Sequence, residues 1–215
     1  MSHYRRGNLP DRHGRETGQG LVEFALVFPL FIMLTLFIIE FAFVFSALLG
    51  VNYASRNGAL MAAEAGNDVL ADCVILQEVE KSIGAPGNKA NVQTVTIYRS
   101  DQSGSTRLAT LTYTRGGGTT CTKGAVSLVV PYSSCNGALI SATVVSGCPA
   151  GTYTYAKRCN VLNGCTIDGV ARKIDTIGTE ITYGHTWVTP IRNFGLAGTG
   201  ATLTQSNAMR MEPIL

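Results

Sequence analysis

The chain has 215 residues, enough for one domain with an appendage but hardly for two full domains. Hydrophobic residues make up 46% of it and charged residues 14%, against about 25% charged in an average soluble protein, which excludes an intrinsically disordered chain and disfavours a highly charged cytosolic enzyme. The net charge is +3, and four arginines precede residue 20, so the body is nearly neutral and no basic face for nucleic acid is visible.

The N-terminal quarter combines a basic leader with a long apolar run. Residues 1–18 are polar and lack apolar periodicity, which is typical of a flexible cytoplasmic leader. Residues 24–51 contain a single charge, Glu40. At about 1.5 Å per helical residue this run can cross a hydrocarbon layer of roughly 30 Å, whereas a cleavable secretory signal has an apolar stretch of only about 7 to 15 residues. We therefore predict a membrane-spanning helix over residues 19–51.

Charge and cysteine distribution predict the orientation of this helix. Four arginines precede it and only Arg56 follows closely, and positive charge is retained in the cytoplasm. We expect a single-pass protein of the inner (cytoplasmic) membrane with its N-terminus inside and residues 52–215 outside. An oxidising compartment favours up to three disulfides, with the pairing left open. All six cysteines lie in the external part: Cys73, Cys121, Cys135, Cys148, Cys159 and Cys165. Zinc is the competing interpretation, but the sequence has no C-x-x-C pair, so we predict neither a metal nor another cofactor.

The segment after the apolar run remains helix-compatible. Small residues recur at i, i+4 spacing along two lines, Ala54, Gly58 and Ala62 and then Ser55, Ala59 and Ala63. Such stripes permit close helix approach, although they are equally compatible with an ordinary alanine-rich surface. Asn67 or Asp68 can cap a further helix over residues 69–83, which Gly84, Pro86 and Gly87 stop.

From Val92 onward the pattern changes to short β-rich runs. Two of them, VQTVTIYRS and TRLATLTYT, are separated by DQSGS and predict a hairpin, and AVSLVVPY forms a third run at residues 125–132. Residues 133–172 hold four cysteines and little periodicity, which predicts a disulfide-stapled insertion of low regular structure. Strands near 177–188 and 201–211 would complete the sheet.

The predicted fold class is α+β, with one N-terminal transmembrane helix extended as a pilin-like helix and followed by a small external antiparallel-sheet domain with disulfides. Its divisions are a leader at 1–18, the transmembrane helix at 19–51, an external helical continuation at 52–88 and a β-rich domain at 89–215. We expect no enzyme, because common hydrolase, nucleotide-binding and zinc motifs are missing from the sequence. His185 is the only external histidine, and we interpret it as a strand residue with its ring packed or solvated.

Residues 18–30, GQGLVEFALVFPL, resemble the N-terminal signature of the TadE-like family, minor pilin-like proteins of the bacterial tight-adherence (Tad) secretion system. The segments FIIEFAFVF at 37–45, NYASRNGALMAA at 52–63 and TQSNAMRMEP at 204–213 are also similar to that family. The related TadG-like proteins share the membrane segment, usually with a larger external domain. About residues 70–175 carry no such resemblance.

The resemblance implies cleavage by a prepilin peptidase between Gly18 and Gln19, which places Glu23 fifth and Phe24 sixth in the mature chain. Cleavage after Gly20 is the alternative and leaves Glu23 third. In pilin-like assemblies the new amino group pairs with the glutamate of a neighbouring subunit, and this pairing strengthens in a low dielectric. The competing interpretation places Glu23 at the cytoplasmic interface among lipid headgroups.

Glu40 lies seventeen residues beyond Glu23, a rotation of roughly 260° at about 100° per residue, so the two carboxylates do not share a helix face. A carboxylate in an apolar run costs on the order of 2 to 3 kcal/mol at mid-membrane and needs a partner or a function. We leave open whether Glu40 makes an assembly contact or lies at the outer interface.

The predicted function is that of a TadE-like minor pilin, or pseudopilin, that is processed by prepilin peptidase and takes part in assembly of a Tad-type pilus or secretion apparatus and thereby in cell adhesion. Its expected partners are the peptidase, other pilin-like subunits, the Tad machinery and the lipid bilayer, with surface assembly as an open possibility. The alternative is an unprocessed, membrane-tethered extracellular binding module.

Overall fold

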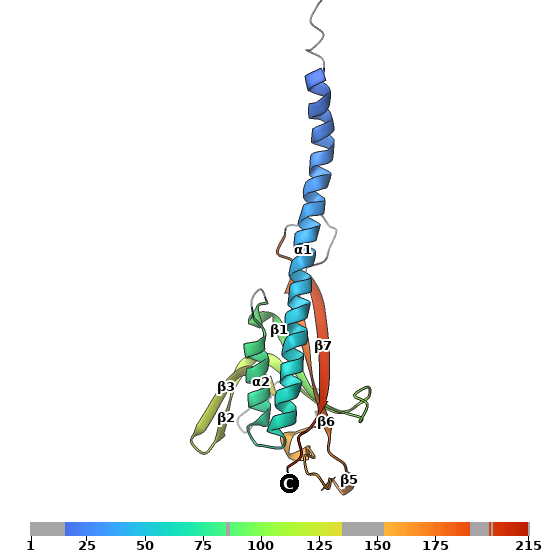
Figure 1. Cartoon of the computed structure of the whole chain (residues 1–215). Helices are drawn as coiled ribbons and strands as arrows, with labels where there is room; N and C mark the ends of the chain where they lie inside the picture. Colours follow the sequence, from blue (N-terminus) through green and yellow to red (C-terminus); the bar gives the residue numbers. More distant parts are fainter. Residues whose placement is uncertain (1–15, 85–86, 135–152, 190–197, 199, 215) are drawn as a thin grey trace, which may run out of the picture.

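A single helix dominates the architecture. The computed structural model describes residues 16–84, 87–134, 153–189, 198 and 200–214. Helix α1 (Glu16–Ala65) is 50 residues long; its N-terminal part projects from the molecule as a stalk, and its C-terminal part lies on a β-sheet domain (Figure 1). Within the described ranges α1 is the one helix long and apolar enough to cross a membrane. Pro29 lies inside it without ending it.

The C-terminal part of α1 is held by small side chains. Both small-residue lines that the sequence shows are buried, and their members pack against helix α2 and the sheet. At Gly58 an added Cβ would lie 2.9 Å from both Thr179 Oγ1 and Val79 Cγ2, a distance that real Cβ contacts do not reach. The stripes therefore serve close packing inside this molecule, and an ordinary alanine-rich surface is the wrong interpretation of them.

Helix α2 (Ala71–Ser82) returns beside α1 (Figure 1). The turn between them begins at Gly66, whose φ of +59° favours glycine. Asp68 Oδ1 accepts a hydrogen bond from the Leu70 backbone N–H at 2.8 Å. Asp68 thus acts in the turn rather than as the N-cap of a helix that begins at residue 69, and α2 begins two residues later than predicted.

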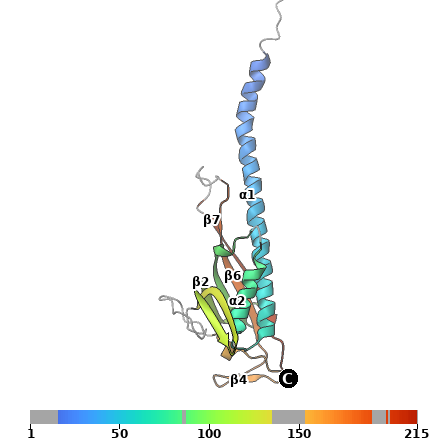
Figure 2. The ribbon, with the colours of Figure 1, turned by 90° about the vertical axis from the view of Figure 1, so that its left-hand side faces the viewer.

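Five antiparallel strands form the main sheet in the order β3-β2-β1-β6-β7. The predicted hairpin is present, with Ile97 opposite Leu111. The strands are β1 (Val92–Ser100), β2 (Arg107–Lys123), β3 (Val126–Ser134), β6 (Thr176–Thr186) and β7 (Gly200–Arg210). The two helices lie on one face of this sheet (Figure 2), and the core fills the space between the layers.

The Cys-rich insertion contains more regular structure than the sequence predicts. Strands β4 (Cys165–Ile167) and β5 (Val170–Arg172) form a short antiparallel hairpin at the end of the domain opposite the stalk (Figures 1 and 2). Three residues are too few to display an alternating pattern, so periodicity could not reveal these strands. Short 3₁₀ turns, η2 (Lys89–Asn91) and η3 (Tyr155–Lys157), precede β1 and this hairpin respectively.

Among the described residues, two disulfides crosslink the external domain. Cys73 pairs with Cys121 and joins α2 to β2, whereas Cys159 pairs with Cys165 across only six positions of sequence. Cys135 and Cys148 lie outside the described residues. The predicted α+β fold with an N-terminal apolar helix, an antiparallel sheet and external disulfides is thus confirmed.

Candidate membrane and assembly site

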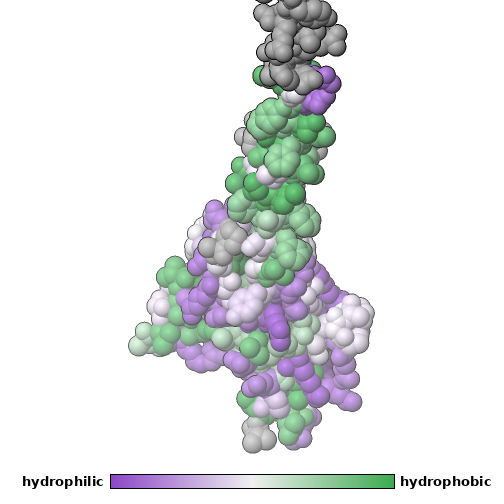
Figure 3. All heavy atoms as spheres, turned by 45° about the horizontal axis from the view of Figure 1, so that its top comes forward, coloured by the Kyte–Doolittle hydropathy of each residue, from purple (hydrophilic) through white to green (hydrophobic). Residues whose placement is uncertain are grey.

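The N-terminal half of α1 exposes large apolar side chains on every face. Its surface forms a continuous hydrophobic stalk above a mostly polar domain (Figure 3). Side chains at least 40% exposed include Leu21, Val22, Phe24, Leu26, Val27, Phe28, Leu30, Phe31, Ile32, Leu34, Phe37, Ile38 and Ile39. Apolar patches of this extent mark membrane or protein contacts. This half of α1 therefore requires lipid or partner helices around it.

The predicted cleavage and assembly residues lie at the start of this stalk. Gln19 and Glu23 are one helical turn apart, and Gln19 Nε2 donates a hydrogen bond to Glu23 Oε1 at 3.2 Å. Phe24 points away from any core, 62% exposed, and its ring stacks on Phe28 at a centroid distance of 4.9 Å. Gly18 is exposed, and a Cβ added there would meet no atom within 4 Å. Glu23 thus has one neutral partner and remains open to a second.

Glu40 has an entirely different environment. Its side chain is buried, and its carboxylate accepts hydrogen bonds from the backbone N–H groups of Val188 at 3.1 Å and Thr189 at 2.7 Å. His185 Nε2 lies 3.1 Å from Oε1 of the same carboxylate, and the His185 ring meets Trp187 edge-on at 5.7 Å. The partners of Glu40 therefore come from the end of β6 within the same chain.

This cluster was missed by the sequence analysis. An isolated glutamate in an apolar run signals that a partner must exist, and His185 was the only external histidine. The missing information was that β6 runs back along α1, which brings together residues 145 positions apart. The sequence alone predicts an assembly contact or an interfacial position for Glu40, and the structure gives it an intramolecular partner instead.

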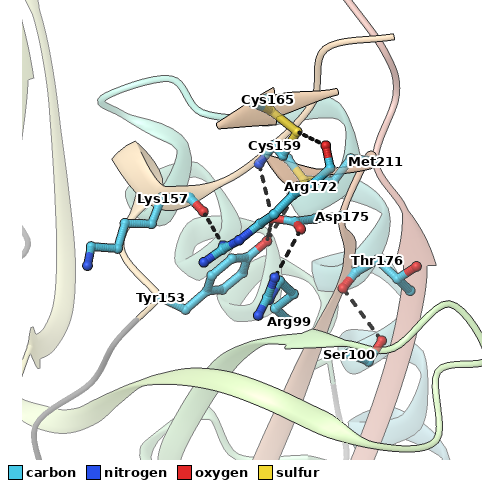
Figure 4. A network of polar contacts seen from close by, with 10 residues as sticks. All are labelled: Arg99, Ser100, Tyr153, Lys157, Cys159, Cys165, Arg172, Asp175, Thr176 and Met211. Carbon is cyan, nitrogen blue, oxygen red and sulfur yellow. Dashed lines mark hydrogen bonds and ion pairs between the residues drawn. A yellow bond between two sulfur atoms is a disulfide. The ribbon is translucent and has the colours of Figure 1, made fainter. Parts of the chain in front are cut away.

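A polar network closes the opposite end of the domain (Figure 4). Asp175 precedes β6, is buried, and accepts hydrogen bonds from Tyr153 Oη at 3.1 Å and from the Cys159 backbone N–H at 3.0 Å. Arg99 Nη1 lies 3.7 Å from the same carboxylate. Burial, and then the charge of Asp175, raise the pKa of Tyr153 well above its ordinary value, so this phenol stays protonated and donates. The network fixes the segment that enters β6.

A second buried cluster ties this end of the domain to the helices. Arg158 and Asp72 are both fully buried and form an ion pair, and Arg158 Nη1 also donates to the Gly66 carbonyl at 3.3 Å. Tyr113 Oη donates to Asp72 at 2.6 Å, and its pKa is raised well above the ordinary value, first by burial and then by the Asp72 charge. Asp72 accepts from both Arg158 and Tyr113, so we interpret the cluster as structural, although Arg158 Nε has no hydrogen-bond partner among the residues described. The described part of the chain holds no group of three or more His, Cys, Asp or Glu residues suited to a metal.

Comparison with known proteins gives a result for the N-terminal helix alone. Residues 18–60 match the family model described as TadE-like protein. Neither the curated proteins nor the solved structures give a significant match. The matched segment is 43 of the 215 residues, so the likeness to that family concerns helix α1 and not the external domain. The matched residues include the exposed stalk, Glu23, Glu40 and most of the small-residue packing face, so this part of α1 is similar to the TadE-like family.

Proposed function

We propose that this chain is a TadE-like minor pilin that inserts into the inner membrane, is processed by prepilin peptidase after Gly18, and assembles with other pilin-like subunits of a Tad apparatus. The observation that carries the proposal is the exposed apolar stalk with Glu23 near its start, in the segment that matches the family. A stalk of this kind can lie in lipid first and among partner helices later, since both surroundings are apolar.

The two ends of the stalk support a transmembrane position. Residues 19–39 precede Glu40, where α1 makes its first hydrogen bonds to the described part of the external domain. These 21 residues span about 31 Å as a helix, close to the roughly 30 Å of a hydrocarbon core. The arginine-rich leader then remains in the cytoplasm. Glu23 lies near the cytoplasmic boundary, where a carboxylate costs less than at the bilayer centre.

Assembly would use the face of α1 that the external domain leaves open. Beyond Glu40, four large side chains remain at least half exposed at successive i, i+4 positions: Phe41, Phe45, Leu49 and Tyr53. This line continues the apolar surface of the stalk along the face away from the sheet, and helices pack through such lines. Cleavage would place the amino group of Gln19 where it can pair with Glu23 of a neighbour.

Intact-mass measurement in host cells with an active prepilin peptidase tests the cleavage. The mature chain should begin at Gln19, and Gly18→Leu should block processing. Gly20→Leu is the matched control, because a Cβ meets no atom within 4 Å at either glycine and neither change should disturb the fold. Blocking by Gly20→Leu alone would move the site to Gly20. An intact N-terminus in the wild type would contradict processing and favour the tethered binding module.

Crosslinking of surface assemblies tests the role of Glu23. Glu23→Gln should leave insertion and disulfide formation unchanged, because removing a charge from an apolar helix does not impair partitioning. Incorporation into assemblies should fail. Glu64→Gln is the matched control, since Glu64 is exposed on the same helix beyond the stalk. Equal recovery of the Glu23 and Glu64 variants at equal expression would show that Glu23 is only an interfacial residue.

A further inference from the structure

The end of β6 forms the part of the external domain that lies beside the stalk. β6 ends at Thr186, and the next residues turn against α1, where the backbone N–H groups of Val188 and Thr189 donate to Glu40. Along α1 from residue 18, Glu40 is the first residue whose side chain is buried. Its hydrogen bonds therefore hold this turn against α1 at the point where the exposed part of the helix ends. We call Trp187 and Val188 the membrane-proximal tip.

The length of the free stalk sets the depth of this tip. If the roughly 31 Å between Gln19 and Ile39 fill the hydrocarbon core, the core ends at Glu40. Trp187 and Val188 then lie at the boundary between hydrocarbon and headgroups. The hydrogen bonds to Glu40 hold them there, since they leave little freedom for the domain to slide along α1.

The side chains of the tip suit that boundary. Val188 is 66% exposed although it is apolar, and Trp187 is partly exposed while its indole Nε1 donates to the Gly198 carbonyl at 2.6 Å. Tryptophan is enriched at membrane interfaces, where its ring is partly apolar and its N–H remains paired.

A cation lies at the same end of the sheet. Val92 is opposite Tyr183, so Lys89, which precedes β1, is near the His185 end of β6, and its neighbours Ala90 and Asn91 line one cavity with His185 and Thr186. Lys89 is exposed and has no ion-pair partner among the residues that the structure describes. An exposed ammonium just outside the hydrocarbon boundary complements anionic lipid phosphates.

We propose that the membrane-proximal tip is a lipid-binding surface, with Trp187 and Val188 inserted in the outer-leaflet interface and Lys89 at the headgroup phosphates. Glu40 is the positioning residue that fixes the depth of the tip through its bonds to residues 188 and 189. The proposal goes beyond the assembly function: it needs α1 to cross the bilayer, and it needs neither cleavage nor partner subunits.

The single tryptophan of the chain makes a direct test possible. The full chain is reconstituted in vesicles of phosphatidylethanolamine and phosphatidylglycerol that contain phosphatidylcholine brominated either near the headgroup or near the acyl-chain end. Trp187 emission should be quenched more strongly by the shallow bromines than by the deep ones. Aqueous acrylamide should quench it less than in the urea-unfolded chain.

Matched variants distinguish lipid contact at the membrane-proximal tip from a general effect of changing the charge of the protein. Val188→Asp should reduce shallow quenching, whereas Val170→Asp should not, because Val170 is similarly exposed, at 57%, but lies in β5 at the far end of the domain. Lys89→Glu should reduce the dependence of quenching on phosphatidylglycerol, with the exposed Lys173→Glu as its control. Native disulfides in each variant, shown by thiol labelling, establish that it has folded.

Resistance of the chain to alkaline carbonate extraction shows whether α1 is inserted in the bilayer. It therefore distinguishes a failure of the lipid-binding proposal from a failure of the transmembrane position. If α1 is inserted but acrylamide quenches Trp187 as fully as in urea and neither brominated lipid does, the tip lies in water and the proposal is overturned. If Trp187 is shielded from both acrylamide and bromines, protein covers the tip, and the proposal is equally overturned. Loss of the chain on extraction would instead contradict the transmembrane position itself.

Discussion

The two halves of α1 belong to one continuous helix and are both poor in charge, yet they have opposite surroundings. Residues 16–39 expose phenylalanine, leucine and isoleucine all round, whereas residues 47–63 bury alanine, glycine and serine against α2 and the sheet. Two glutamates show the same contrast: Glu23, in the exposed half, is exposed, whereas Glu40, between the two halves, is enclosed by hydrogen bonds. Hydrophobicity alone does not distinguish a face for lipid from a face for protein. The size of the side chains does, because only small ones permit close approach of the backbone.

The largest expected effect comes from a substitution in the Arg158–Asp72 cluster, which ties the external domain to the C-terminal end of α1. Arg158→Ala leaves the Asp72 carboxylate buried without its positive partner, with only the Tyr113 hydroxyl still donating to it, and removes a donor to the Gly66 carbonyl. We therefore expect a loss of about 3 to 5 kcal/mol in the free energy of unfolding. Chemical denaturation of the full chain in detergent measures this. The neighbouring Lys157→Ala breaks an exposed pair with Asp168 and should change nothing measurable. Equal effects of the two variants would show that the cluster is not desolvated.

A slightly smaller loss is expected when α2 is released from the sheet. Removing the disulfide with Cys73→Ser and Cys121→Ser opens a connection across 48 positions and should cost about 2 to 4 kcal/mol. Opening Cys159–Cys165, which spans six positions, should cost less, because a shorter closed loop restricts the unfolded chain less. Under mild reduction the external domain should loosen while the helicity of the stalk persists. Thiol labelling with circular dichroism checks this, and a stalk that unfolds first would contradict it.

The two glutamates provide the next comparison. Glu40→Gln should lose about 1.5 to 3 kcal/mol, since hydrogen bonds to a charged acceptor are replaced by bonds to a neutral amide and one amide group faces backbone donors. Glu23→Gln should leave the stability of the domain unchanged, because its contacts are confined to Gln19 on the same helix. Denaturation of both variants in detergent decides the point. A destabilised Glu23 variant, or a wild-type-like Glu40 variant, would contradict the contrast between an open and an enclosed carboxylate.

Local patterns predicted much of this fold. The apolar run, the second helix, the β1–β2 hairpin and the β6 and β7 strands each follow from contiguous residues whose periodicity matches their structure. The β4–β5 hairpin was not predicted, because each of its strands has only three residues.

Local sequence carries one candidate site and not the other. Gly18, Gln19 and Glu23 lie within six residues of one another at the spacing of a prepilin cleavage site, and their role stays a prediction. The Glu40 cluster depends on strand order and on the length of β6, and no local pattern contains that information. Disulfide pairing is equally hidden from local sequence. The number of cysteines indicates disulfides, but the pairing of Cys73 with Cys121 depends on how the fold places α2 against β2.

The smallest expected effect tests side-chain size within a single helix. At Gly58 an added methyl group would lie 2.9 Å from Thr179 Oγ1 and Val79 Cγ2, both of them on stiff β-branched side chains, so Gly58→Ala should cost about 1 to 3 kcal/mol through overpacking. Gly50 lies eight residues earlier in α1, and a Cβ there would meet no atom within 4 Å. Gly50→Ala should therefore stabilise the helix by about 0.5 to 1 kcal/mol, because alanine loses less backbone entropy on folding than glycine.

The opposite signs make this pair informative, because both variants introduce the same methyl group into the same helix. Denaturation midpoints in detergent give the change in the free energy of unfolding for each variant, provided that the slope of the denaturant dependence is unchanged. If both variants are stabilised, the sheet can move away from α1, and the small size of the side chains is not what determines how residues 47–63 pack. If both are destabilised, the helix near Gly50 also has a close neighbour, and the boundary between its lipid-facing and protein-facing halves lies nearer the N-terminus.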